Sequence, residues 1–188
     1  MPIYQLALFV HIVVAFGIIA SVAIDALAVN GMRSAETAEQ ARPWLFTFRS
    51  LRILGPLSLG LTVVMGLYLM ASSWGWRGWI TGGLVGLVAI GAIGGLLTGT
   101  RMARIGPAVG PAQGRLTDEM RRLLGDPVLV LSSRLRIALV LGVLFLMSVK
   151  PSTAGSIVVL VIAIGLGAAV TPLWSGRRST GVLQPSRR

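Results

Sequence analysis

A single histidine, His11, lies within the first apolar stretch of the chain. Ionisable or ligating side chains inside a membrane span are functional candidates by default. At 1.5 Å per residue, His11 lies about 12 Å below the end of the first predicted helix, and Met65, on the antiparallel second helix, lies at about the same depth. A histidine–methionine pair can ligate haem iron. The alternatives are that His11 hydrogen-bonds a neighbour and fixes helix packing, or that it handles protons.

Asp25 is the only acidic residue within a predicted span, fourteen residues after His11 and on nearly the same side of that helix. Four arginines are predicted at the same end of the bundle: Arg52, Arg101, Arg134 and Arg136. We expect an orienting ion pair between Asp25 and one of them, with a proton relay as the alternative. Lys150 precedes Pro151 and is expected to cap the fourth span at the opposite surface, where its side chain reaches the headgroups.

Five apolar stretches must hold these side chains at their depths, and each can cross about 30 Å of hydrocarbon as a helix. The predicted spans are Ile3–Val29, Leu51–Ala71, Gly78–Gly99, Val128–Val149 and Thr153–Trp174. The short connections leave no room for a separate soluble domain. We therefore expect an all-α membrane protein, a five-transmembrane-helix bundle forming one domain over residues 1–174, with a basic cytoplasmic tail over residues 175–188.

The amino-acid composition and the absence of certain motifs limit the classes of function that the chain can have. Of the 188 residues, 54% are hydrophobic and 12% are charged, against about 25% charged in soluble domains. The absence of cysteine excludes disulfides, iron–sulfur clusters, thiolate metal sites and cysteine lipidation. The chain has no G-x-x-x-x-G-K-[ST] loop, no H-E-x-x-H motif and no paired intramembrane carboxylates. These features argue against hydrolytic and ATP-driven functions.

The basic residues predict the orientation. If the five spans cross the membrane in turn, 15 of the 17 lysines and arginines fall on one side and only Arg77 and Lys150 on the other. The positive-inside rule then puts the N-terminus outside and the C-terminus in the cytoplasm, in the bacterial inner (plasma) membrane. The net charge of +11 indicates contact with anionic lipid headgroups rather than nucleic acid, because the basic residues are not interleaved with aromatic ones.

The third span is rich in glycine at spacings of four residues. Small residues allow helices to approach closely, so this helix is predicted to be central in the bundle or to form the contact of a homo-oligomer. The glycines expected to act in packing are Gly82, Gly86, Gly91, Gly95 and Gly99.

The connections carry several helix signals. Ser34 is predicted to cap a helix after the first span, and Pro43 to open a further one. Thr117 is predicted to cap a short surface helix that ends at Leu124. The fourth span is predicted to begin at Pro127, after the cap residue Asp126.

Three tryptophans gather on the turn between the second and third spans: Trp74, Trp76 and Trp79. They are expected to anchor the helix hairpin at the membrane interface. A cation–π contact with Arg77 is a further expectation.

Four short motifs carry a family resemblance: Leu6-Ala-Leu-Phe-Val-His11, Leu51-Arg-Ile-Leu-Gly-Pro56, Gly66-Leu-Tyr-Leu69 and Phe145-Leu-Met-Ser-Val-Lys-Pro151. With them the chain resembles an uncharacterised actinobacterial-type family of small bacterial integral membrane proteins. It is more distantly similar to the CopD-type copper-resistance and HemJ-type protoporphyrinogen oxidase proteins. The HemJ resemblance implies haem on His11, with Arg52 and Lys150 as polar partners.

The chain departs from the HemJ pattern at two places. Arg136-Ile-Ala-Leu-Val stands where those enzymes carry an asparagine–glutamate pair, and the third span ends Leu97-Thr-Gly-Thr-Arg101 without their later histidine. The leading hypothesis is a polytopic inner-membrane protein with haem as its candidate cofactor. The alternatives are a HemJ-type membrane oxidase, and a structural or small-transporter subunit that acts as an oligomer.

Overall fold

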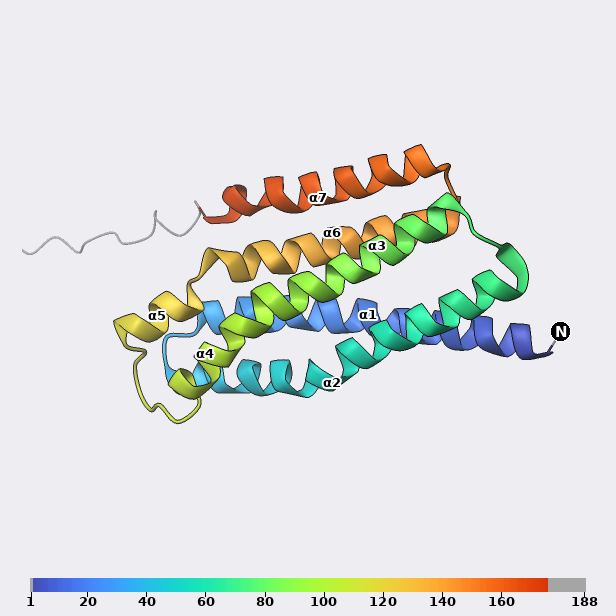
Figure 1. Ribbon diagram of the computed structural model, residues 1–188. Helices are drawn as coiled ribbons and strands as arrows, with labels where there is room; N and C mark the ends of the chain where they lie inside the picture. The colour runs from blue at the N-terminus through green and yellow to red at the C-terminus, as the bar shows by residue number, and fades with distance from the viewer. Residues whose placement is uncertain (1, 176–188) are drawn as a thin grey trace, which may run out of the picture.

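Long apolar runs form the helices, because a helix satisfies all its internal backbone hydrogen bonds without water. The structure is a computed structural model that describes residues 2–175, and the side chains of residues 3–169. It is 89% helical, and its described part contains no β-strand. In chain order the elements are α1 (Pro2–Ser34), α2 (Ala38–Leu69), η1 (Met70–Trp74), α3 (Gly78–Ala92), η2 (Ile93–Gly99), α4 (Thr100–Val109), α5 (Asp118–Leu124), α6 (Pro127–Val149) and α7 (Thr153–Ser175) (Figure 1).

Four helical segments of the described chain are long and apolar enough to cross a membrane: Ile3–Ser34, Ala38–Trp74, Gly78–Val109 and Asp118–Val149. Thr153–Ala169 is a shorter apolar helix. The five predicted spans therefore correspond to four long helices and one shorter one. This architecture fits a multi-pass membrane protein.

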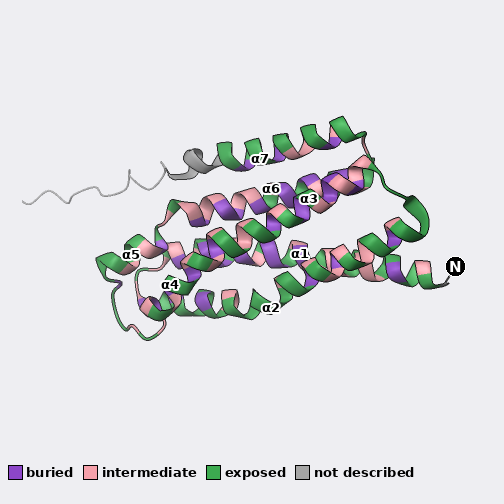
Figure 2. Ribbon diagram, in the orientation of Figure 1, coloured by how far each residue is buried: buried purple, intermediate pink, exposed green. Residues whose placement is uncertain are grey.

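The long helices lie side by side (Figure 1). α1 packs along α2 and against α6, while α3 and α7 both contact α6, and α7 forms one edge of the bundle. Buried apolar residues form two clusters, a larger one where α1, α2, α4, α5 and the start of α6 meet and a smaller one between α1, α3 and α6. The described side chains of α7 are mostly exposed (Figure 2). The outward surface is mostly apolar, and buried polar residues lie inside. A bundle that meets lipid has this distribution.

The connection between α1 and α2 differs from the prediction. α1 continues to Ser34, and the cap of α2 is Thr37, whose hydroxyl accepts from the Gln40 amide at 3.3 Å. Pro43 lies inside α2, so the predicted helix starts at Ser34 and Pro43 are both wrong. The reason is tertiary: the amide of Ala38 donates to the Gly114 carbonyl at 2.9 Å, which fixes the start of α2 against the loop after α4.

The other helix signals are confirmed. The Thr117 hydroxyl accepts from the Met120 amide at 3.3 Å and caps α5. The Asp126 carboxylate accepts from the Val128 amide at 2.8 Å, and α6 begins at Pro127. α6 ends at Val149, and Lys150 adopts the left-handed conformation (φ 52°, ψ 54°).

The third helix is longer than predicted. α3 continues through the π-helical segment η2 into α4, so the helical rod extends to Val109. Gly106 and Pro107 lie within α4, although glycine and proline together are typical of a turn. The predicted tail lies outside the described residues except for Ser175.

Candidate functional site: a cavity beside a buried ion pair

Asp25 of α1 and Arg136 of α6 form an ion pair inside the bundle. Nη1 of Arg136 donates to Oδ2 of Asp25 at 2.7 Å. Asp25 is 7% exposed and Arg136 is 5% exposed, so both charges are removed from solvent. The ion pair expected for Asp25 therefore exists, and Arg136 is its partner among the four candidate arginines.

A small hydroxyl network extends this pair toward η2. Nη2 of Arg136 donates to the Thr98 hydroxyl at 3.3 Å, and the Thr98 and Ser132 hydroxyls lie 2.6 Å apart. Thr98 is the buried residue of the π-helical segment η2, a geometry that occurs often at functional sites. Neither Thr98 nor Ser132 is predicted as a site residue from the sequence. The available signal was a threonine within the apolar, glycine-rich third span.

Gly94 provides the room for the arginine. A Cβ at Gly94 would lie 3.5 Å from Nη1 and 3.6 Å from Cδ of Arg136, so the guanidinium rests on the bare backbone of η2. Nε of Arg136 is buried and has no hydrogen-bond partner among the described residues. Buried N–H groups are almost always paired, so this unpaired donor is an exception that calls for an explanation.

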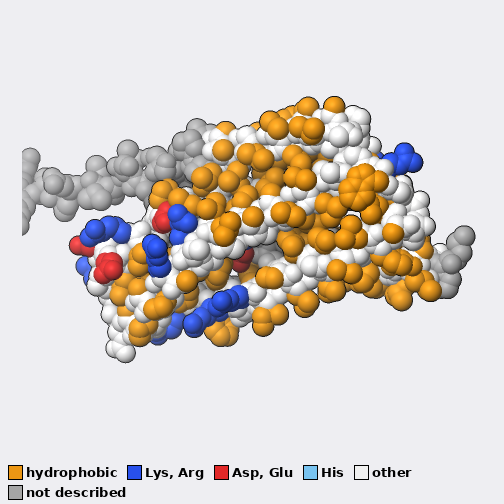
Figure 3. All heavy atoms as spheres, viewed as in Figure 1, with side chains coloured by type: hydrophobic (Ala, Val, Ile, Leu, Met, Phe, Trp, Pro, Cys, Tyr) orange, Lys and Arg blue, Asp and Glu red, His pale blue; other side chains and the backbone are white. Residues whose placement is uncertain are grey.

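A cavity of about 930 Å³ opens beside this ion pair. Its lining comes from α1, α2, α3, η2, α4 and α6. The lining includes Ile18, Asp25, Arg49, Arg52, Leu59, Gly60, Ile90, Gly91, Gly95, Gly106 and Arg136. Figure 3 shows a hollow on the face toward the viewer, with acidic atoms at its floor and basic side chains beside it. The volume lies near the upper end of the roughly 300–1,000 Å³ typical of small-molecule sites.

The charges of the cavity are unbalanced. Three arginines line it, Arg49, Arg52 and Arg136, against one acidic residue, Asp25. Arg136 holds Asp25, whereas Arg49 and Arg52 are exposed and make no ion pair with any described residue. The cavity therefore presents an unneutralised positive rim above mostly apolar and glycine walls.

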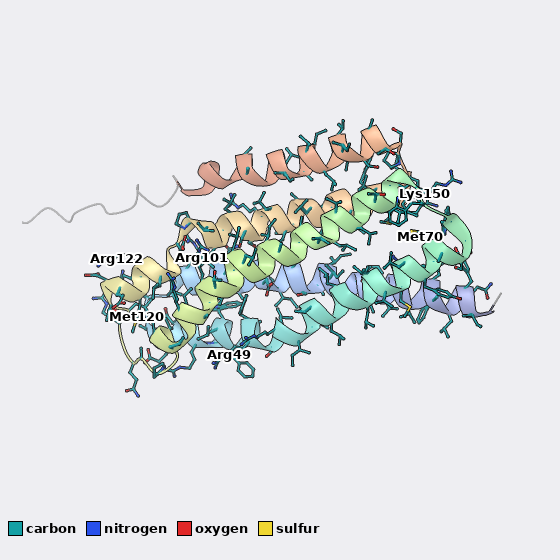
Figure 4. The ribbon with its side chains drawn as sticks, viewed as in Figure 1. Arg49, Met70, Arg101, Met120, Arg122 and Lys150 are labelled. Atoms are coloured by element: carbon teal, nitrogen blue, oxygen red, sulfur yellow. The ribbon has the colours of Figure 1, made fainter. Side chains whose placement is uncertain are left out.

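Charged side chains gather at the ends of the bundle (Figure 3). Figure 4 shows Arg49, Arg101 and Arg122 toward the end that carries α5, and Lys150 at the opposite end. Arg101 is paired with Asp126 at 2.7 Å, which joins α4 to the start of α6. The cavity thus has its arginine rim on the side of the basic end.

His11 lies elsewhere, against α2. Its Nδ1 donates to the Thr62 carbonyl oxygen at 3.1 Å, with the tautomer set by that acceptor. A Cβ at Gly66 would lie 3.2 Å from Cε1 of His11, so the ring is packed against the bare backbone there. Met65 neighbours Gly66 in the sequence and is half-buried. Neither His11 nor Met65 lines the 930 Å³ cavity.

The structure places the two polar partners that the HemJ resemblance implies at separate sites. Arg52 lines the cavity. Nζ of Lys150 lies 3.9 Å from the ring centroid of Trp74 and 5.7 Å from that of Trp79. The cation over these tryptophans is therefore Lys150, whereas the sequence suggested Arg77. Nε1 of Trp74 also donates to the Tyr4 hydroxyl at 3.2 Å.

The glycines of the third helix divide into two groups. A Cβ at Gly82 would lie 3.0 Å from Cβ of Ser156, and one at Gly86 would lie 2.5 Å from Cγ2 of Val143, so these two glycines lie at contacts with α7 and α6. Gly91, Gly95 and Gly99 line the cavity, and a Cβ at Gly95 would meet nothing within 4 Å.

A metal site of several ligands is not present in the part of the chain that the structure describes, where no three histidine, cysteine, aspartate or glutamate residues gather. The described residues form a cavity with charged side chains in one part and apolar walls elsewhere. No family model matches the chain, and neither a curated protein nor a solved structure matches it, so the site is interpreted from its own residues.

Proposed function

We propose that this multi-pass membrane protein binds an amphiphilic, membrane-soluble ligand in the cavity between α2 and the rod formed by α3, η2 and α4. The observation that carries the proposal is the 930 Å³ cavity, which has charged groups at one part and apolar or glycine walls elsewhere. Ligand sites generally combine a mostly apolar lining with a few convergent polar groups.

The surroundings of the cavity favour a ligand that arrives from the bilayer. Ile53 and Leu57 on α2 and Leu96 on η2 are 75%, 55% and 69% exposed, and each neighbours a lining residue in sequence. Large exposed apolar side chains at membrane depth meet lipid chains. A hydrophobic molecule can therefore reach the cavity sideways without crossing water.

Two glycine positions allow a direct test. A Cβ at Gly60 or Gly95 would meet nothing within 4 Å, and both residues line the cavity. Leucine at either position adds a side chain at the cavity lining, where its Cβ meets no neighbouring atom. Gly165 on α7 is also open at its Cβ position and does not line this cavity, so Gly165→Leu is the matched control.

The experiment is native mass spectrometry of the protein released from lipid–detergent micelles. We expect wild type and Gly165→Leu to keep one amphiphile at collision energies that strip peripheral lipid, and Gly60→Leu and Gly95→Leu to lose it. Retention of the amphiphile by both cavity variants at the level of Gly165→Leu would refute the proposal. Thermal unfolding of all four proteins checks that each is folded.

Haem binding through His11 is a second candidate function. The hydrogen bond between His11 and the Thr62 carbonyl favours it. Metal-ligating histidines typically donate their other ring N–H to a carbonyl or carboxylate, and Nδ1 of His11 donates to the Thr62 carbonyl. This leaves Nε2 for a metal. The residues fit haem only in part. His11 offers one axial ligand, and it does not line the cavity that is large enough for a porphyrin. HemJ-type oxidase activity depends on this candidate.

Absorption spectra of purified wild type and His11→Ala test the second candidate. A Soret band that is present in wild type and lost in the variant supports it, and a colourless wild-type preparation counts against it. Because His11 does not line the cavity, His11→Ala is expected to leave amphiphile retention unchanged.

We further propose that the arginine-rich end faces the cytoplasm of a bacterial cell, with the N-terminus outside. The support is the distribution of basic residues, of which only Arg77 and Lys150 are expected at the other surface. In this orientation the rim of the cavity lies toward the cytoplasmic leaflet.

A further inference from the structure

We infer that the ligand of this cavity is a net-negative phospholipid, with its headgroup at Arg49 and Arg52 and its acyl chains along the apolar part of the cavity. This inference rests on the proposed function and names its ligand class. Three observations support it: the free arginines at the rim, the unpaired donor of Arg136, and the separation of charged from apolar lining along the helices.

The rim arginines are available to a ligand. Arg49 and Arg52 are both exposed, and neither makes a hydrogen bond or ion pair with any described residue. The one carboxylate in the lining, Asp25, is held by Arg136 at 2.7 Å. Guanidinium groups bind phosphate oxygens in a bidentate manner, which suits a headgroup phosphate.

Arg136 is a further polar residue of the cavity, and it is more deeply buried than Arg49 and Arg52. Arg136 lines the cavity and is 5% exposed, and its Nε lacks a partner. Nε itself is closed off from the cavity, so an oxygen of the headgroup or of the glycerol ester accepts from this N–H once the guanidinium turns toward the ligand, which removes the cost of leaving a buried donor unpaired. A purely apolar ligand would leave this donor unsatisfied.

The lining changes character along its length. On α2 the lining runs from Leu45 to Gly60, which corresponds to about 22 Å of helix. Its charged members are Arg49 and Arg52, and the lining beyond them on α2 carries no charge. On α1 the charged Asp25 is followed, toward the N-terminus, by Val22, Ser21 and Ile18. A molecule with an anionic head and long apolar chains matches this order.

The test uses delipidated wild type in native mass spectrometry with phosphatidylglycerol or phosphatidylcholine at equal concentration. Both lipids carry a phosphate, but only phosphatidylglycerol is net negative. A basic residue near an anionic lipid surface contributes about 1 kcal/mol, or about fivefold. With two free arginines we expect retention of phosphatidylglycerol to exceed that of phosphatidylcholine by about tenfold or more.

Variants of Arg49 and Arg52 test whether these two side chains cause the preference for phosphatidylglycerol. The double variant Arg49→Gln/Arg52→Gln is expected to lose most of the preference, and Arg49→Lys/Arg52→Lys to keep part of it. Arg104→Gln is the matched control, since Arg104 is an exposed arginine on α4 that does not line the cavity. A preference that Arg104→Gln reduces as much as the double variant would overturn the inference and indicate general surface attraction.

Different results would contradict the proposed amphiphile binding and the inference that the ligand is an anionic phospholipid. If wild type holds both lipids equally and Gly60→Leu and Gly95→Leu release both, the cavity binds amphiphiles but the anionic headgroup is wrong. If those two variants release neither lipid, the proposed function fails and this inference fails with it.

Discussion

Asp25 and Arg136 are 111 residues apart in the sequence, yet Nη1 of Arg136 lies 2.7 Å from Oδ2 of Asp25 in the interior of the bundle. The contact joins α1 to α6 beside the cavity. It also neutralises the only acidic residue of the lining, so the remaining arginines stay positive toward a ligand. The pair is thus a structural link between helices, and it leaves Arg49 and Arg52 as the charged lining residues without an ion-pair partner.

Removal of one partner of this pair should destabilise the bundle strongly. Asp25→Asn leaves Arg136 buried without a counter-charge, and breaking a buried pair in this way costs about 3–5 kcal/mol. We expect that loss in the free energy of unfolding, measured by denaturation with sodium dodecyl sulfate in mixed micelles. The control is Glu119→Gln, which removes an exposed carboxylate on α5 and should change the free energy by less than about 0.5 kcal/mol.

The double variant Asp25→Asn/Arg136→Met makes that prediction specific. It removes both charges, so we expect it to be more stable than Asp25→Asn alone. Equal losses in the single and double variants would show that the charge itself contributes little.

Close approach of α1 and α2 depends on a reciprocal arrangement of glycine and serine. A Cβ at Gly17 would collide with Oγ of Ser58, and one at Gly55 would lie 2.8 Å from Oγ of Ser21. Overpacking of such a contact costs about 1–3 kcal/mol. We expect Gly17→Val and Gly55→Val to lower the thermal unfolding midpoint, whereas Gly165→Val, at an open position of α7, should leave it nearly unchanged.

Removal of the Ser58 side chain tests whether the clash with Ser58 causes the loss of stability in Gly17 variants. Since Gly17 meets the Ser58 side chain, Ser58→Gly in the Gly17→Ala background should restore part of the lost midpoint. No recovery in the double variant would mean that the glycine acts through something other than this contact.

The tryptophans at the end of the bundle opposite α5 report on Lys150. Its Nζ lies 3.9 Å from the Trp74 ring centroid, and a cation over an indole contributes about 0.5–1 kcal/mol at exposed sites. Lys150→Met should therefore shift tryptophan emission and lower stability by about this amount. Arg77→Met removes the cation that the sequence suggested and should cause the smaller spectral change. The reverse order would contradict the contact.

Much of the architecture could be predicted from local patterns. Apolar length identifies the membrane-length helices, and cap residues such as Thr117 and Asp126 set helix starts, because both depend on neighbouring residues only. The start of α2 was missed because Thr37 is fixed by contacts with residues 114–116, which no local pattern reports. Asp25 was expected to pair with one of four arginines, and only the packing of α6 selects Arg136.

The cavity could not be predicted, because it depends on how far α2 lies from the rod that contains η2. Gly91, Gly95 and Gly99 were expected to act in helix packing, but a four-residue spacing is the same whether a glycine meets a neighbouring helix or lines a space. Thr98 could not be identified either, because an apolar pattern does not report which residue of η2 meets Ser132.

A crystal structure of the protein grown in a lipidic mesophase that contains phosphatidylglycerol tests the central claim most directly. We predict elongated electron density in the cavity, with its head at Arg49 and Arg52 and an acceptor atom within hydrogen-bond distance of Nε of Arg136. A cavity closed by direct packing of α2 against η2 and α4, with that nitrogen bonded to the protein itself, would contradict the account.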